Sequence, residues 1–175
     1  MPKTRNGGPF TLNFRFQPRN RMFGLAIGID NYQCNAIRDL QGCKRDAESI
    51  RECLSDIFRV PSDHFLLLTN EAATRSAIIT GFENHLIKNS NIERGDAIVL
   101  FYAGHGSRTV APRGWVADDS KVETICPYDE RTFDDNGGEI FGIPDRTIGG
   151  LLRRLASSKG DNIVRLTRQT VLFSS

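Results

Sequence analysis

The side chain best placed for chemistry is His105, which stands between two glycines directly after an apolar run, Ala97–Tyr102. The run is short and rich in β-forming residues, which predicts a strand buried on both faces of a parallel sheet. We therefore expect His105 just past the carboxyl end of a core strand, the edge where ligands bind in open α/β sheets. The flanking glycines would let the backbone turn sharply and let a substrate chain come close. The alternative is a histidine in a tight turn that only hydrogen-bonds its own loop.

The cysteines show no Cys-x-x-Cys pairing, which predicts neither a zinc site nor a disulfide framework. A reduced, cytoplasmic setting fits such a set. No apolar run approaches the ~20 residues of a membrane helix, and the N-terminus lacks the apolar core of a secretory signal. The four cysteines are Cys34, Cys43, Cys53 and Cys126.

The first 22 residues carry basic side chains and no acid. Such an arm could touch nucleic acid or an acidic membrane surface. The alternative is a solvated, disordered tail, and we expect this alternative over residues 1–21, with neither nucleic acid nor membrane as a partner. The basic residues are Lys3, Arg5, Arg15, Arg19 and Arg21.

Apolar runs and helical stripes alternate along the rest of the chain, which predicts an α/β fold with a mostly parallel sheet and helices on both faces. The segment Ser107–Gly142 is polar and glycine-rich, and it predicts a long irregular connection with one short extended piece at Thr124–Pro127. Asp145 is expected to cap the last helix. The predicted strands are Met22–Ile29, Phe65–Leu68 and Ala97–Tyr102, and the predicted helices are Cys43–Phe58, Thr74–Ile87 and Asp145–Ser158.

Four segments in this order and spacing resemble the large-subunit region of the caspase and metacaspase family of cysteine endopeptidases, as found in fungal caspase-like proteins. The resemblance covers residues 22–163 and implies one domain with a caspase-like three-layer sandwich, incomplete at its C-terminal side. Programmed cell death is implied by the family alone. The segments are Phe23–Tyr32, Leu40–Ala47, Phe101–Ser107 and Glu123–Asp129, the last followed by Gly142–Asp145.

The resemblance implies a dyad of His105 with a cysteine on the turn after the next strand. A free thiol is only a few per cent ionised at neutral pH, and a neighbouring imidazole raises the thiolate fraction and later protonates the leaving amine. Backbone N–H groups, including that of Gly106, would hold the developing oxyanion. Protein or peptide substrates are the implied partners.

The resemblance also bears on specificity. Caspases have an arginine that grips a substrate aspartate where this chain has Leu40. In metacaspases the acid matching Asp46 lines the pocket and favours cleavage after arginine or lysine, which is charge pairing in a confined site. The alternative for Asp46 is a first-turn helix acid stabilised by the macrodipole. Cys43 belongs to the motif that lines the same cleft in metacaspases, and Ala103, at a position where many metacaspases have serine, is also expected there.

The family's next strand leads into the nucleophile cysteine, whereas residues 164–175 diverge and no cysteine follows Cys126. We expect a truncated protease region with a frame-shifted, mis-spliced or alternatively spliced tail, lacking the nucleophile and the strands that would complete the sheet. Cys43 is a weak substitute nucleophile and Cys126 a weaker one. This chain alone is then expected to be inactive, since the histidine has no thiol to activate.

No cofactor is required by the sequence, but the metacaspase resemblance makes calcium a candidate, with hard oxygen ligands from Asp118, Asp119, Asp134 and Asp135. Their spacing is no EF-hand loop, and a solvated acidic loop is the alternative. A function of a different class is also open: a non-catalytic pseudo-protease, or an interaction module that binds peptides or an intact caspase-like paralogue through an unpaired sheet edge.

Overall fold

The apolar run Met22–Gly28 forms strand β1, inside a six-stranded sheet in which β2 (Phe65–Thr69) and β3 (Ala97–Val110) lie on either side of it. The computed structural model describes residues 20–111, 114–115 and 120–171. Both neighbours run parallel to β1. The predicted strands at residues 22 and 65 are confirmed within one residue, because apolar side chains with no alternation suit a strand covered on both faces.

Strand β3 is longer than predicted and contains His105. Its first part lies between β1 and β6, and its last part, from Gly106 to Val110, pairs antiparallel with β4 (Lys121–Ile125). The expectation that the strand ends at Tyr102, with His105 beyond it in a sharp turn, was wrong. Two neighbouring strands supply backbone hydrogen-bonding partners past the apolar run, so the chain stays extended through both glycines.

Residues 163–171 form strand β6 (Ile163–Val171), parallel to β3. We expected residues 164–175 to be a divergent tail and the strands that would complete the sheet to be missing, whereas the structure adds one strand here. Valine, threonine and alternating polar residues suit a half-exposed edge strand, although the segment lacks the continuous apolar run of a central one. The position of β6 also means that β3 has neighbours on both sides, contrary to the open edge predicted there.

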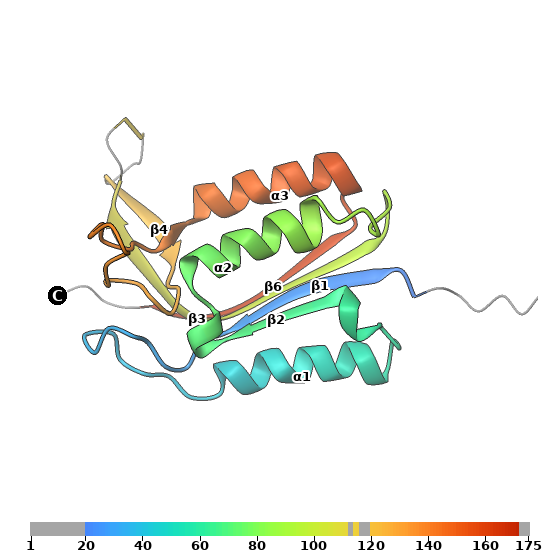
Figure 1. The fold of residues 1–175 in the computed structure, drawn as a ribbon, viewed down its shortest axis with the longest axis horizontal. Helices are drawn as coiled ribbons and strands as arrows, with labels where there is room; N and C mark the ends of the chain where they lie inside the picture. Colours follow the sequence, from blue (N-terminus) through green and yellow to red (C-terminus); the bar gives the residue numbers. More distant parts are fainter. Residues whose placement is uncertain (1–19, 112–113, 116–119, 172–175) are drawn as a thin grey trace, which may run out of the picture.

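Helices cover both faces of the sheet, which confirms the layered α/β prediction (Figure 1). Helix α1 (Cys43–Asp56) lies on one face, and α2 (Arg75–Thr80) and α3 (Asp145–Lys159) lie on the other. The π-helical turn η3 (Gly81–Ile87) continues α2 directly. The short 3-10 turns η1 (Ser62–His64) and η2 (Asn70–Ala72) flank β2.

The predicted caps of the helices have different outcomes. Thr74 caps α2, its hydroxyl accepting a hydrogen bond from the backbone N–H of Ala77 at 3.1 Å. Asp145 does not cap α3, because it is the first helical residue and Pro144 holds the cap position without a side-chain bond. The segment predicted to be irregular over 107–142 contains strand β4, which pairs with β3 and with β5 (Ile143–Pro144).

Two apolar clusters fill the space between the layers. The larger lies between the sheet and the α2–α3 layer, and the smaller packs Ala26, Phe101 and Ala103 against Cys43 and Ala47 of α1.

None of the helices within the described ranges combines the length and apolar character needed to cross a bilayer.

The last residue of the predicted arm, Arg21, is held in the fold. Its guanidinium donates from Nε and Nη2 to the two carboxylate oxygens of Asp96, each at 2.6 Å. Asp96 is 8% exposed and also accepts from the backbone N–H of Glu93. Residues 1–19 of the arm lie outside the described residues.

Candidate functional site

His105 lies two residues beyond the point where β1 ends, because Gly28 at the end of β1 pairs with Ala103 of β3. It therefore lies at the carboxyl edge of the parallel strands, as predicted, although within a strand. The residue is 3% exposed. Its backbone N–H donates to the hydroxyl of Tyr32 at 2.8 Å, and the two rings lie 5.2 Å apart between centroids.

Gly104 permits close packing at this point of the strand. A Cβ on Gly104 would stand 2.6 Å from the hydroxyl oxygen of Tyr102 and 3.2 Å from that of Tyr32. Tyr102 is buried, and its hydroxyl lies 2.7 Å from the His105 carbonyl oxygen and 3.1 Å from that of Cys126. The glycine thus allows close approach, while the sharp turn predicted for it is absent.

Both ring nitrogens of His105 face backbone carbonyls of the same chain. Nε2 lies 2.7 Å from the carbonyl oxygen of Arg38, and Nδ1 lies 3.1 Å from that of Thr170. A neutral imidazole has one N–H and can donate to only one of these oxygens, whereas an imidazolium could donate to both. The ring is thus held between the loop after β1 and the end of β6.

The loop that supplies the Arg38 carbonyl is closed by Asp30. Its carboxylate accepts hydrogen bonds from the backbone N–H groups of Cys43 at 2.8 Å and Lys44 at 3.2 Å. These are the first donors of α1, whose cap residue Gly42 has no side chain to satisfy them. The Asp30 carbonyl also accepts from Leu40 at 2.7 Å, so the loop returns to its origin.

Asp46 lies in the first turn of α1 and is half-buried, with a side chain 36% exposed. It forms an ion pair and a hydrogen bond with Arg168 of β6. The hydrogen bond to Asp46 is the main cause that raises the pKa of Arg168. The carboxylate predicted to bind a basic side chain therefore holds an arginine of the chain itself.

Cys43 and Ala103 are predicted at the substrate cleft, but both are buried between the sheet and α1, at 4% and 0% exposure. Neither side chain is open to a ligand in this structure. Burial and the neighbouring Asp30 carboxylate raise the pKa of the Cys43 thiol to about 11. Such a thiol is almost wholly protonated at neutral pH, which argues against Cys43 as a substitute nucleophile.

Cys126 is fully buried beneath the site, with Glu130 beside it. Burial and the Glu130 carboxyl raise the pKa of its thiol far above the ordinary range. Burial also raises the pKa of Glu130. Oxygen Oε2 of Glu130 has no hydrogen-bond partner among the residues that the structure describes. Cys126 is therefore an inert core thiol.

Gly106 lies in β3 between β4 and β6, opposite Ile125 and Val171. A Cβ on Gly106 would stand 3.3 Å from Oε1 of Gln169, so this side chain covers the glycine. Its role as an oxyanion donor stays a prediction.

The motif Glu123–Asp129 ties three parts of the fold together. Asp129 accepts a hydrogen bond from the backbone N–H of Arg75 at 2.8 Å and thereby satisfies the first turn of α2. Tyr128 donates from its backbone to Ala73, and its carbonyl accepts from Gln33 in the loop after β1. The structure thus gives this motif a positioning role.

The acids considered for calcium are only partly described. Asp118 and Asp119 lie outside the described residues. Asp134 accepts hydrogen bonds from the backbone N–H groups of Asn136 and Gly138 at 2.9 and 2.8 Å and so closes its own turn next to Asp135. Within the described ranges no three His, Cys, Asp or Glu side chains gather as a metal site would require. A calcium site stays a prediction.

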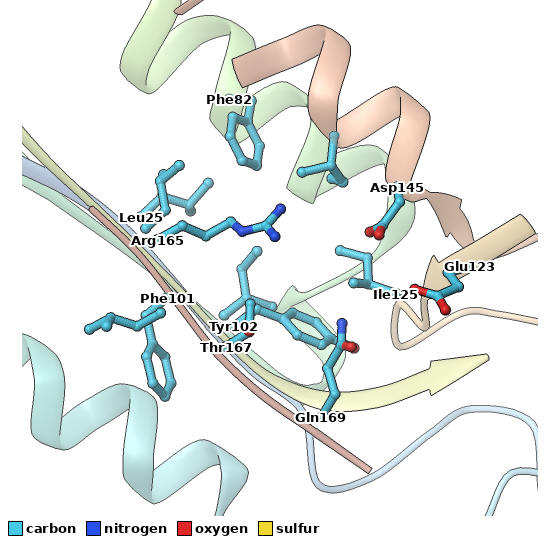
Figure 2. Close-up of a pocket in the computed structure, with 14 residues that line it drawn as sticks. Leu25, Phe82, Phe101, Tyr102, Glu123, Ile125, Asp145, Arg165, Thr167 and Gln169 are labelled. Atoms are coloured by element: carbon cyan, nitrogen blue, oxygen red, sulfur yellow. The ribbon is translucent and has the colours of Figure 1, made fainter. Parts of the chain in front are cut away.

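A cavity of about 210 Å³ lies on the face of the sheet that α3 covers. Figure 2 shows Arg165 of β6 pointing into it beneath Phe82 and toward Asp145, while Phe101 points to α1 on the opposite face. His105, like Phe101 an odd-numbered residue of β3, belongs to the α1 face because side chains alternate along a strand. This cavity is therefore separate from the face that carries Asp46 and His105.

Several residues of the site were missed by sequence reasoning: Tyr32, Arg38, Glu130, Arg168 and Thr170. The first three contribute a hydroxyl, a carbonyl and a buried acid from segments with no periodic pattern. The last two lie in the segment that diverges from the family, where no motif marks them.

Comparisons with known proteins identify the family of the chain. A family model described as "Metacaspase, peptidase C14 domain" matches residues 24–157. Metacaspase-1 of Arabidopsis thaliana is 33% identical over 120 residues, covering 66% of this chain and 31% of that protein. Metacaspase-1 of Schizosaccharomyces pombe is 31% identical over 143 residues, covering 75% and 33%. The chain thus spans about a third of the length of these relatives.

Similarity to a solved structure supports the fold, and the fold alone. The crystal structure of a protein from Geobacter sulfurreducens superposes with a TM-score of 0.59 at 21% sequence identity, covering 86% of this chain and half of that one. At this identity the likeness concerns the arrangement of strands and helices, and it agrees with the predicted three-layer sandwich.

Proposed function

Because the chain belongs to the metacaspase family, we propose that it forms the histidine-bearing part of a cysteine-type endopeptidase site at the carboxyl edge of its parallel strands. Such an enzyme cleaves a peptide bond by attack of a thiolate on the scissile carbonyl. The single observation that best supports the proposal is the position of His105, at that edge and opposite Thr170 at the end of β6.

In the proposed mechanism His105 is the general base and later the general acid. It would take the proton of the attacking thiol and give it to the leaving amine, and the backbone N–H of Gly106 would stabilise the oxyanion. The contacts of the His105 ring nitrogens with the carbonyl oxygens of Arg38 and Thr170 support this role, because they fix the orientation of the ring.

Cleavage after arginine or lysine is proposed from Asp46. Its contact with Arg168 supports this proposal, because the carboxylate is accessible to a guanidinium group. A carboxylate on a partly enclosed surface prefers a cationic side chain to a neutral or acidic one.

We propose that this chain alone hydrolyses no peptide. Residues 169–171 pass His105 without a cysteine. Cys43 and Cys126 are buried, and burial raises the pKa of each thiol. Neither of these two buried thiols is therefore readily ionised for the base to use.

The test is hydrolysis of peptide amides with arginine, lysine, leucine or aspartate before the scissile bond. We expect no release by the wild-type chain with any of them. Release that is specific for arginine and lysine and lost in His105→Ala would overturn the proposed inactivity while supporting the protease site.

A second candidate is an interaction module, and the free edge of β6 favours it. Among the described residues β6 pairs with β3 alone, and its residues Val164 and Leu166 are 51% and 43% exposed. An unpaired edge of this kind is a template for a further strand. Sedimentation of the chain with an intact metacaspase, compared with each alone, tests it: a mixed complex supports the module, and independent sedimentation contradicts it.

A further inference from the structure

Strand β6 presents two different faces. Residues in register with Phe101, Ala103 and His105 share the face of α1, because side chains alternate along neighbouring strands. Arg168 and Thr170 therefore lie on the α1 face. Arg165 lies on the opposite face and points into the cavity beneath α3 (Figure 2).

Arg168 lies at the beginning of α1. It pairs with Asp46, and its Nη1 would lie 3.7 Å from a Cβ placed on Gly42. The Arg168 side chain is 62% exposed. An exposed pair of this kind is weakly held, so another cation can displace it.

The same strand also contacts His105. Thr170 follows Arg168 by two residues, which is about 7 Å along an extended chain, and its carbonyl faces Nδ1 of the histidine. One extended segment thus places the Arg168 side chain on Asp46 and the Thr170 carbonyl on His105. A bound peptide substrate would need access to both Asp46 and His105.

We propose that Arg168 is a specificity-determining residue of this site, which competes with the arginine or lysine of a bound peptide for the carboxylate of Asp46. The inference rests on the proposed function, since it takes Asp46 as the acid that binds basic side chains. With Arg168 in place, the subsite carries little net charge and selects basic residues weakly. Removal of Arg168 leaves the carboxylate free and strengthens that selection.

The experiment measures the affinity of acetyl-arginine amide by NMR titration, with acetyl-leucine amide as the neutral control. We expect Arg168→Gln to bind the arginine probe about two- to fivefold more tightly than wild type, the range set by an exposed ion pair. The matched control is Arg165→Gln, which removes an arginine from the other face of the same strand and should leave affinity unchanged. Asp46→Asn added to Arg168→Gln should remove the gain.

Two results would overturn the inference in different ways. Equal affinity in wild type and Arg168→Gln, with weaker binding in Asp46→Asn, would leave Asp46 as the basic subsite but show that Arg168 does not compete. If Asp46→Asn leaves the affinity for acetyl-arginine amide unchanged in both the wild type and Arg168→Gln, the proposed specificity and this inference are both wrong. Arg168→Lys is a second variant that keeps the charge and should stay near wild-type affinity.

Discussion

His105 is held in place by one side-chain hydroxyl and two main-chain carbonyls. Its N–H is bound by the hydroxyl of Tyr32, and its ring nitrogens face the carbonyls of Arg38 and Thr170. These contacts fix the ring on the α1 face. The chemistry of the ring then depends on which side chain of β6 lies next to it.

The cysteines differ in environment, which predicts their reactivity. Cys53 is exposed, whereas Cys43 and Cys126 are buried. With the pKa of Cys43 raised to about 11, its thiolate fraction at pH 7.5 is lower than that of an ordinary cysteine by roughly a hundredfold. We expect iodoacetamide to modify Cys53 in the folded chain and to spare Cys43 and Cys126, as followed by mass spectrometry.

His105→Ala is the control for this labelling and should leave the rate at Cys43 unchanged. A Cys43 that reacts faster than Cys53 in the wild type and slows in His105→Ala would show that it serves as the nucleophile.

At the scale of elements, the packing of α1 on β1 depends on Gly28. A Cβ there would stand 2.4 Å from the carbonyl oxygen of Cys43, a backbone atom that cannot move without shifting the helix. Gly28→Ala should lower the free energy of unfolding by about 2 kcal/mol, as overpacking typically does. Urea unfolding measures it.

Gly149→Ala is the matched control, because this glycine lies inside α3 and a Cβ would meet only the tip of Arg153 at 3.5 Å. It should raise stability by about 0.5–1 kcal/mol. Equal effects of the two substitutions would contradict the packing account.

The start of β3 is anchored by Asp96. Burial alone would raise the pKa of this carboxyl, but the hydrogen bonds from Arg21 and the Glu93 N–H outweigh it and hold the pKa below its ordinary value. Asp96→Asn should lower the free energy of unfolding at pH 7 by about 2 kcal/mol. The exposed Asp161 is the control position, and Asp161→Asn should be close to neutral.

The sign of the pH dependence follows from the lowered pKa. The stability that Asp96 contributes is complete above the pKa of the unfolded chain and is lost as pH falls through the folded value. The difference between wild type and Asp96→Asn should therefore narrow below about pH 4. A difference that stays constant down to pH 2 would contradict this account.

Most elements could be predicted from the sequence because their signals are local. The apolar runs of β1 and β2 and the stripes of α1 and α3 report burial directly. The extension of β3 through His105 could not be predicted, because it depends on hydrogen-bonding partners in β4 and β6. Strand β6 has exposed polar residues along its length, so its sequence carries little sign of its place in the sheet.

For the whole molecule, the family resemblance predicts roles for His105 and Asp46, but the surroundings of both side chains depend on contacts between distant segments. Arg168 lies 122 residues from Asp46 along the chain, and Thr170 lies 65 from His105. Neither pairing has a local pattern. We therefore propose a metacaspase-family fold in which His105 is the base and strand β6 places no thiol beside it.

The most direct measurement of that claim is the alkylation of Thr170→Cys by iodoacetamide at pH 7, with Cys53 as an internal reference. Residue 170 is in register with His105, and a neighbouring imidazole raises the thiolate fraction of a thiol. We predict that the introduced thiol reacts roughly tenfold faster than Cys53, and that His105→Ala removes the advantage. Equal rates at the two thiols, unaffected by His105→Ala, would contradict the account.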